Sequence, residues 1–244
     1  MPSTVSEAIE ALRAGQFIMV YDFADREAEV DLMIGAEFVE PHHIAFLRQY
    51  GGGLICVAVS YEVGLLLDLP YIEDLYRCVI NEYPLLEKLA REPAPYGKPT
   101  FSITVNARTT YTGITDTDRA TTVQELGVFL RNVFLLHRFR TAERARREFA
   151  LRFRSPGHVP ILIATRGELV NRQGHTEIAV YLAKQARIAP AVCLCECLDG
   201  ETFQALSLEK AERFAADHNI PLITGDQVLE HAGIEYAAPP RTRR

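Results

Sequence analysis

Short apolar runs alternate with amphipathic segments in the second half of the chain, and this alternation constrains the fold more than any other feature. The apolar runs predict strands at Val159–Ala164, Ala191–Glu196 and Leu222–Thr224, and helices are predicted between them at Thr176–Ala186 and Ser207–His218. Such alternation favours a layered α/β fold, because each helix covers a face of the sheet.

The first half predicts two strands joined by a short polar loop instead of a helix. The strands are Phe17–Tyr21 and Leu32–Ala36, and a connection this short suits antiparallel neighbours. We therefore expect an α/β (α+β) fold, a three-layer α-β-α arrangement around a mixed twisted sheet. The remaining predicted elements are helices at Val5–Ala14, Pro41–Tyr50 and Ala120–Phe139, and strands at Leu54–Val59 and Thr100–Asn106.

Length and charge limit the classes of protein that this chain can represent. With 244 residues, 48% of them apolar, the chain can bury a large core, and its net charge of -6 gives no general reason to bind nucleic acid. We find no signal peptide and no run long enough to span a bilayer, so we expect a cytoplasmic protein without membrane partners. We expect one domain over 1–244, with a basic helical insertion near 131–154 and a short tail at 233–244.

Two further segments give weaker predictions. Residues 68–99 are rich in proline and tyrosine and lack a clear period, so we expect an irregular excursion and a candidate lid. Cys193, Cys195 and Cys197 alternate along a predicted buried strand without a CxxC loop, which favours reduced core thiols over a zinc site.

The loop between the first two strands is acidic, with the sequence DREAEVD at Asp25–Asp31. In an extended backbone Glu27, Glu29 and Asp31 would share one face, which suits a hard cation or proton abstraction. Arg26 adds an anion contact. A solvated charged turn is the alternative, but the position between two apolar strands favours a site.

A second motif, Asn171–Glu177, enters a predicted helix. Gly174 precedes the helix, whose free N–H groups and dipole favour phosphate, and Arg172 adds a charged fork. Thr176 can add a hydroxyl. His175 suits a metal ligand, although His175 or Thr176 could equally be a helix cap.

Three further features complete the candidate site. His158 follows a predicted proline–glycine turn before a strand, where it either faces a pocket or is packed. The segment Thr109–Asp116 offers hydroxyls for a polyol, or serves as a plain connector. Glu196 ends an apolar strand and is a candidate general acid or base. Together the motifs indicate a divalent-metal enzyme acting on a small phosphorylated polyol.

At these residues the chain resembles the 3,4-dihydroxy-2-butanone 4-phosphate synthase family. The resemblance covers roughly residues 5–232 and rests on the joint occurrence of DREAEVD, GGGLIC, TTYTGITDTDRATT, SPGHV, RQGHTE and CECLDG. The form TYTGITD is similar to the archaeal branch, and we expect a monofunctional enzyme. The family loop usually reads DRENEGD, so Ala28 and Val30 depart from it, and we expect altered backbone shape more than lost chemistry.

The resemblance also implies roles for individual residues. Glu27 and His175 are implied to bind Mg²⁺, with Mn²⁺ as an alternative and two divalent ions per site. Substrate contacts are implied for Arg26, Glu27, Asp31, Thr112, Arg172, Gln173, Gly174, His175, Thr176 and Glu196. Catalytic or other active-site roles are implied for Glu29, Asp31, His158, Glu196 and Cys56.

The activity implied by the resemblance is a lyase reaction of riboflavin biosynthesis. D-ribulose 5-phosphate is converted to L-3,4-dihydroxy-2-butanone 4-phosphate and formate by metal-stabilised enediolate formation, dehydration, skeletal rearrangement and formate loss. The resemblance also implies a homodimer with active sites near the interface. Two alternatives remain at this point: another metal-dependent sugar-phosphate isomerase or aldolase, and a nucleotide- or RNA-binding module that uses the arginine-rich stretch.

Overall fold

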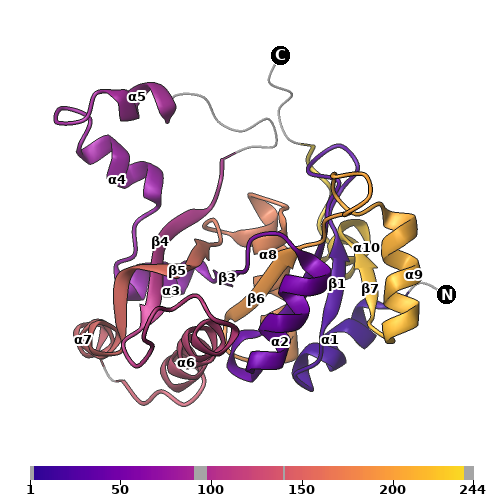
Figure 1. The fold of residues 1–244 in the computed structure, drawn as a ribbon, viewed down its shortest axis with the longest axis horizontal. Helices are drawn as coiled ribbons and strands as arrows, with labels where there is room; N and C mark the ends of the chain where they lie inside the picture. Colours follow the sequence, from indigo (N-terminus) through magenta and orange to yellow (C-terminus); the bar gives the residue numbers. More distant parts are fainter. Residues whose placement is uncertain (1–2, 91–97, 140, 239–244) are drawn as a thin grey trace.

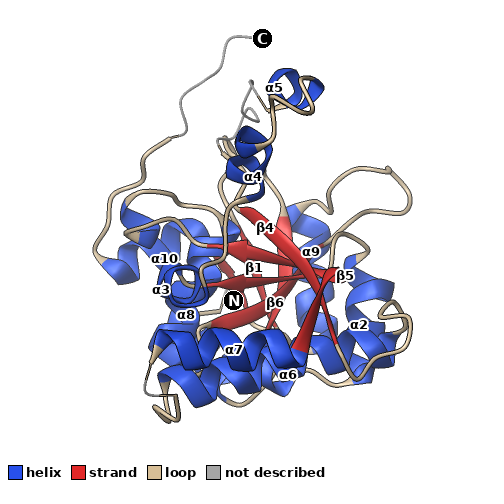
Figure 2. Cartoon of the chain, turned by 90° about the vertical axis from the view of Figure 1, so that its left-hand side faces the viewer, coloured by secondary structure: helices blue, strands red, loops and turns tan. Residues whose placement is uncertain are grey.

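The structure, a computed structural model, describes residues 3–90, 98–139 and 141–238. Its centre is a seven-stranded sheet with helices on both faces (Figures 1 and 2). The strands are β1 Ile18–Tyr21, β2 Val30–Gly35, β3 Cys56–Val59, β4 Phe101–Ala107, β5 Phe153–Ile163, β6 Ala191–Glu196 and β7 Leu222–Thr224. Their order across the sheet is β4-β5-β3-β6-β2-β1-β7.

Two hydrophobic clusters fill the spaces between the sheet and its helices. The α-helices are α1 Val5–Arg13, α2 Pro41–Phe46, α3 Tyr61–Leu67, α4 Ile72–Cys78, α5 Leu85–Leu89, α6 Asp116–Phe134, α7 Ala142–Arg152, α8 His175–Ala186, α9 Leu208–His218 and α10 Gly225–Ala232. Buried residues of α1, α8 and α10 form one cluster, and those of α2, α3, α6, α7 and α9 belong to the other. The predicted three-layer arrangement is therefore confirmed.

The sheet is mixed, as predicted, and its register begins to build the site. Strand β2 pairs antiparallel with both β1 and β6, whereas β3 runs parallel to β5. In the β2–β6 register Asp31 lies opposite Glu196. Since side chains alternate along a strand, and Met33 and Leu194 pack in the cluster that contains α8, Asp31 and Glu196 face the α8 side as well.

The region after α3 is more regular than predicted. Helices α4 and α5 occupy part of the expected irregular excursion and project away from the layered body (Figure 1). Neither helix buries a residue, so the sequence lacks the apolar period that reveals a packed helix. Residues 91–97 lie outside the described part, and closure of this region over a ligand stays a prediction.

The turn predicted before the fifth strand is wrong, because Ser155–His158 lies inside β5. Asn106 pairs with Arg154, while the preceding Val105 pairs with Val159, so the four intervening residues bulge from the ladder. A Cβ atom on Gly157 would lie 2.0 Å from the carbonyl carbon of Val105, so only glycine fits this approach. The bulge depends on pairing with β4, which local sequence does not reveal.

The basic insertion is part of the helical layer. Phe149 of α7 packs against Phe129, with ring centroids 5.8 Å apart, and Arg146 donates to the carbonyl of Leu66 at the end of α3. Arg140 and the arginines of the tail lie outside the described residues. The cysteines of β6 are buried and unpaired, in agreement with reduced core thiols. None of the described helices is long and apolar enough to cross a membrane.

Candidate active site

The acidic loop is folded around one buried carboxylate, Asp22, which stands at the end of β1. Its Oδ2 accepts hydrogen bonds from the backbone N–H of Glu27 (3.0 Å) and from Nη1 of Arg26 (2.9 Å), and its Oδ1 accepts from Glu29 N–H (3.0 Å). Ala28 has a left-handed φ of 56°. The expected extended backbone is therefore wrong, although the carboxylates still reach one pocket. The family's usual Asn at position 28 tolerates this φ better than Ala.

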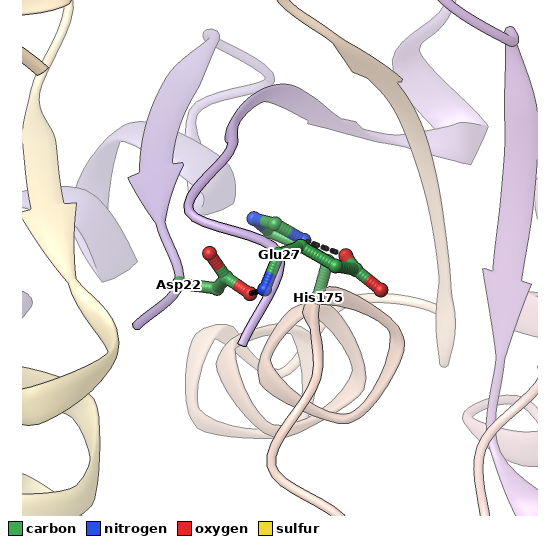
Figure 3. Close-up of side chains that lie close together, drawn as sticks. All are labelled: Asp22, Glu27 and His175. Atoms are coloured by element: carbon green, nitrogen blue, oxygen red, sulfur yellow. Dashed lines mark hydrogen bonds and ion pairs between the residues drawn. The ribbon is translucent and has the colours of Figure 1, made fainter. Parts of the chain in front are cut away.

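Glu27 meets His175, the first residue of α8, at the centre of the site (Figure 3). His175 Nδ1 lies 3.2 Å from Glu27 Oε2, and His175 Nε2 lies 3.7 Å from Asp31 Oδ1. Both His175 Nε2 and Asp31 Oδ1 are buried without a hydrogen-bond partner among the described residues. A buried carboxylate oxygen and an imidazole nitrogen without hydrogen-bond partners fit a divalent cation, which takes both groups in their deprotonated forms.

Asp22 also lies within ligand distance of this pair, since one atom each of Asp22, Glu27 and His175 fall within 4.8 Å of one another. Both oxygens of Asp22, however, already accept hydrogen bonds from the acidic loop and its arginine. Asp22 therefore shapes the loop, whereas Glu27 and His175 are the two residues that the resemblance implied for a metal.

The charges of the site shift the pKa values of its acids in different directions. Burial alone would raise the pKa of Glu27, but the hydrogen bond from His175 and the charge of Arg26 outweigh it and lower the pKa to about 2. Burial raises the pKa of Asp31, against the attraction of His175. Burial and the charge of Glu27 also raise the pKa of Glu29. One pocket thus contains a firmly ionised carboxylate and two that bind protons more readily.

Two guanidinium groups converge at the N-terminus of α8. A Cβ atom on Gly174 would lie 2.4 Å from Nη1 of Arg172 and 2.5 Å from Nη2 of Arg26. Helix N–H groups and two arginines at one point provide a strong site for a phosphate. Arg172 Nη1 also donates to Oε2 of the fully buried Glu177 at 2.5 Å, and Glu177 Oε1 accepts from Thr165 N–H at 2.9 Å.

Glu196 is oriented by the glycine run after α2. Its Oε2 accepts from Leu54 N–H at 2.7 Å, and a Cβ atom on Gly53 would lie 2.4 Å from the same oxygen. Thr100 adds a hydroxyl that lies 3.0 Å from that of Thr176. The pocket is lined by Arg26, Glu27, Glu29, Asp31, Pro99, Thr100, Phe101, Leu162, Arg172, His175, Thr176, Leu194 and Glu196.

Some predicted site residues lie outside this pocket. Thr112 and His158 are joined through Asn106, whose Nδ2 lies 3.3 Å from Thr112 O and 3.1 Å from His158 Nδ1. Asn106 lies five positions after pocket-lining Phe101 along β4, a distance of roughly 16 Å at the usual rise of a strand. Gln173 instead contacts the C-terminal segment.

Cys56 is fully buried in β3, where its thiol contacts Leu194 O. Burial raises its pKa, so the group is a neutral thiol at physiological pH.

Sequence reasoning missed the roles of Asp22, Glu177 and Thr100. Glu177 belongs to the motif Asn171–Glu177, and Asp22 lies three positions before the acidic motif, but the partners of both depend on the folded chain. A useful signal was available for Glu177, since a buried acid in the first turn of an apolar helix requires a partner. A larger groove between α1 and α9 lies away from these residues, and none of the predicted catalytic, substrate-binding or metal-binding side chains lines it.

The fold and the site define a layered α/β enzyme whose centre combines a carboxylate–histidine pair with two guanidinium groups at a helix N-terminus. The family model described as 3,4-dihydroxy-2-butanone 4-phosphate synthase matches residues 6–231. The chain belongs to this family, which confirms the resemblance seen in the sequence.

Individual relatives agree with this assignment. The synthase of Methanothermobacter thermautotrophicus is 39% identical over 227 residues, which cover 93% of this chain and 94% of the relative. That of Archaeoglobus fulgidus is 40% identical and covers 92% of each chain. The crystal structure of the Candida albicans synthase has a TM-score of 0.70 at 30% identity, covering 95% of this chain and 98% of that one. A synthase in complex with two magnesium ions has a TM-score of 0.73 at 26% identity, covering 94% and 96%.

Proposed function

We propose that this chain converts D-ribulose 5-phosphate to L-3,4-dihydroxy-2-butanone 4-phosphate and formate, the reaction of its family in riboflavin biosynthesis. The observation that carries the proposal is the convergence of Arg26 and Arg172 at Gly174, directly beside the Glu27–His175 pair. This arrangement can bind the phosphate of a short sugar while its oxygens reach the carboxylates. The atoms of the substrate balance those of the two products, so no redox partner is required.

The carboxylates supply the proton transfers in this proposal. Asp31 and Glu196 face each other across neighbouring strands, and Glu29 lies in the same pocket. A carboxylate whose pKa is raised by burial is a stronger base, which suits Asp31 for removing a proton from substrate carbon. Glu29 and Glu196 can then donate and accept the protons of the dehydration and rearrangement. Phe101, Leu162 and Leu194 contribute apolar side chains to the wall of the pocket.

Glu27 and His175 would hold the divalent ion, for which we propose Mg²⁺, replaceable by Mn²⁺, with two ions per site. When bound, such an ion stabilises negative charge that develops on the substrate oxygens. The synthase structure with two magnesium ions supports this choice. Oxygen and imidazole ligands are compatible with both metals.

Purified protein supplied with D-ribulose 5-phosphate and Mg²⁺ is expected to release formate and a four-carbon phosphate in equal amounts. Excess EDTA is expected to abolish the release, and added Mg²⁺ or Mn²⁺ to restore it. Formate measured with a coupled dehydrogenase and the phosphate product measured by mass spectrometry test the assignment. A folded, magnesium-loaded protein that consumes the substrate without formate would instead be an isomerase or aldolase.

We also propose a homodimer in which each protomer completes the site of its partner. Thr112 and His158 lie together but apart from the pocket, and the neighbouring Tyr111 is 92% exposed. In a dimer, Thr112 and His158 of one protomer could reach the pocket of the other, whereas within one chain they lie apart from the pocket.

A mixing experiment tests the shared site. Glu27→Gln and His158→Ala homodimers are each expected to be inactive. After exchange of subunits, each mixed dimer contains one site with both native residues, so activity is expected to return. No recovery in verified mixed dimers would place His158 in the site of its own chain or outside the site altogether.

A further inference from the structure

The segment after α10 contacts both parts of the chain that carry the arginines of the proposed phosphate site. These are the acidic loop with Arg26 and the segment that begins α8 with Arg172. In Figure 1 the yellow C-terminal segment runs beside the indigo loop that follows β1. The side chain of Gln173, only 6% exposed, makes two hydrogen bonds to this segment: Nε2 donates to Glu235 O, and Oε1 accepts from Ala237 N–H, both at 2.8 Å. Both the nitrogen and the oxygen of the Gln173 side-chain amide are therefore hydrogen-bonded to main-chain atoms.

Tyr236, in the same segment, contacts the acidic loop. Its hydroxyl donates to Asp25 Oδ1 at 2.5 Å, and its ring stacks on Phe23 with centroids 4.1 Å apart and planes at 26°. Phe23 is buried and packs against Gly225 at the start of α10. A hydrogen bond to a carboxylate is stronger than one between neutral groups, and together with the stacked rings it holds the loop against the C-terminal segment.

The contacts on both sides lie next to the two arginines. Asp25 precedes Arg26, and Gln173 follows Arg172. Two guanidinium groups repel each other, and their convergence at Gly174 depends on the distance between the acidic loop and the start of α8. Glu235–Ala237 bonds to both and thereby ties the acidic loop to the start of α8. Asp22 and Glu27 pair with Arg26, and Glu177 pairs with Arg172.

We propose that Glu235–Ala237 is a C-terminal latch that positions Arg26 and Arg172 to bind the substrate phosphate. Tyr236 and Gln173 are positioning residues in this latch, and Gln173 acts through the main chain instead of touching substrate. The inference rests on the proposed function for the identity of the substrate, but the phosphate site itself can be probed separately.

Tyr236→Phe removes the hydroxyl and keeps the stacked ring. This variant is expected to raise the KM for D-ribulose 5-phosphate and the inhibition constant of inorganic phosphate by about tenfold each, with a much smaller change in kcat. Tyr181→Phe is the matched control, since it removes a hydroxyl that contacts His231 Nδ1 at 2.8 Å away from the pocket. It is expected to leave both constants unchanged.

Ala237→Pro is a second variant that weakens the latch, because it removes the N–H that donates to Gln173. It is expected to raise the KM for D-ribulose 5-phosphate and the inhibition constant of inorganic phosphate as well. In a double-mutant cycle, Asp25→Ala and Tyr236→Phe should be non-additive, since each breaks the same contact. Calorimetric titration with inorganic phosphate provides a readout that does not depend on turnover.

A lowered melting temperature with unchanged KM and phosphate affinity in both latch variants would overturn the proposal and leave the segment a structural role only. Weakened phosphate binding in Tyr236→Phe, with no formate released by the unaltered protein, would support the latch and reject the proposed reaction.

Discussion

Glu27→Gln is expected to lower kcat by at least about 10³-fold while the protein stays folded, because it removes a charged ligand from the proposed metal site. His175→Ala removes the other ligand and is expected to have an effect of similar size. Calorimetric titration with Mg²⁺ should show weakened binding in both variants, alongside loss of formate release. Circular dichroism and thermal melting establish that each variant is folded.

Glu10→Gln is a matched control for the first variant. Glu10 is an exposed carboxylate paired with Arg13, as Glu27 is paired with Arg26, but it lies on α1 outside the site. It is expected to retain the turnover and magnesium affinity of the unaltered protein. Native turnover in either Glu27→Gln or His175→Ala would show that the metal site has been assigned to the wrong residues.

Glu177→Ala is expected to destabilise the protein by about 3–5 kcal/mol, because it leaves the partly buried charge of Arg172 without its carboxylate. It also leaves Thr165 N–H without its acceptor. The same change frees Arg172 from its position at Gly174, so the KM for D-ribulose 5-phosphate should rise. Urea denaturation measures the first effect, and steady-state kinetics of the folded fraction measure the second.

Glu209→Ala is the control for this variant. Glu209 also lies in the first turn of a helix and pairs with an arginine, Arg213, but both side chains are exposed. The free energy of unfolding should change by less than about 0.5 kcal/mol. If Glu177→Ala were as stable as Glu209→Ala and had native KM, Glu177 would have no role in positioning Arg172.

The sequence by itself determined the layered class, most strands and helices, and which chemical groups the two main motifs offer. The spacing of apolar residues in β6 and α8 is a local property. It is visible in the sequence because each element buries one or both of its faces. The resemblance implied Glu27 and His175 as metal ligands, and the structure brings the two side chains within 3.2 Å of each other.

Other features depended on contacts that no local pattern contains. Glu27 and His175 are 148 positions apart, and they meet because β2 pairs with β6 while α8 docks over the same face. The loop of Glu27 could not be predicted from alternation, since its shape comes from Asp22 accepting three hydrogen bonds.

Tertiary structure also decided where the remaining motif residues lie. His158 lies in the bulge of β5, away from the pocket. The side chain of Gln173 bonds to the main chain of the C-terminal segment. Composition and spacing indicate which side chains are available for chemistry. Which of them share one pocket is decided by strand register and helix docking, because these bring together residues that are distant along the chain.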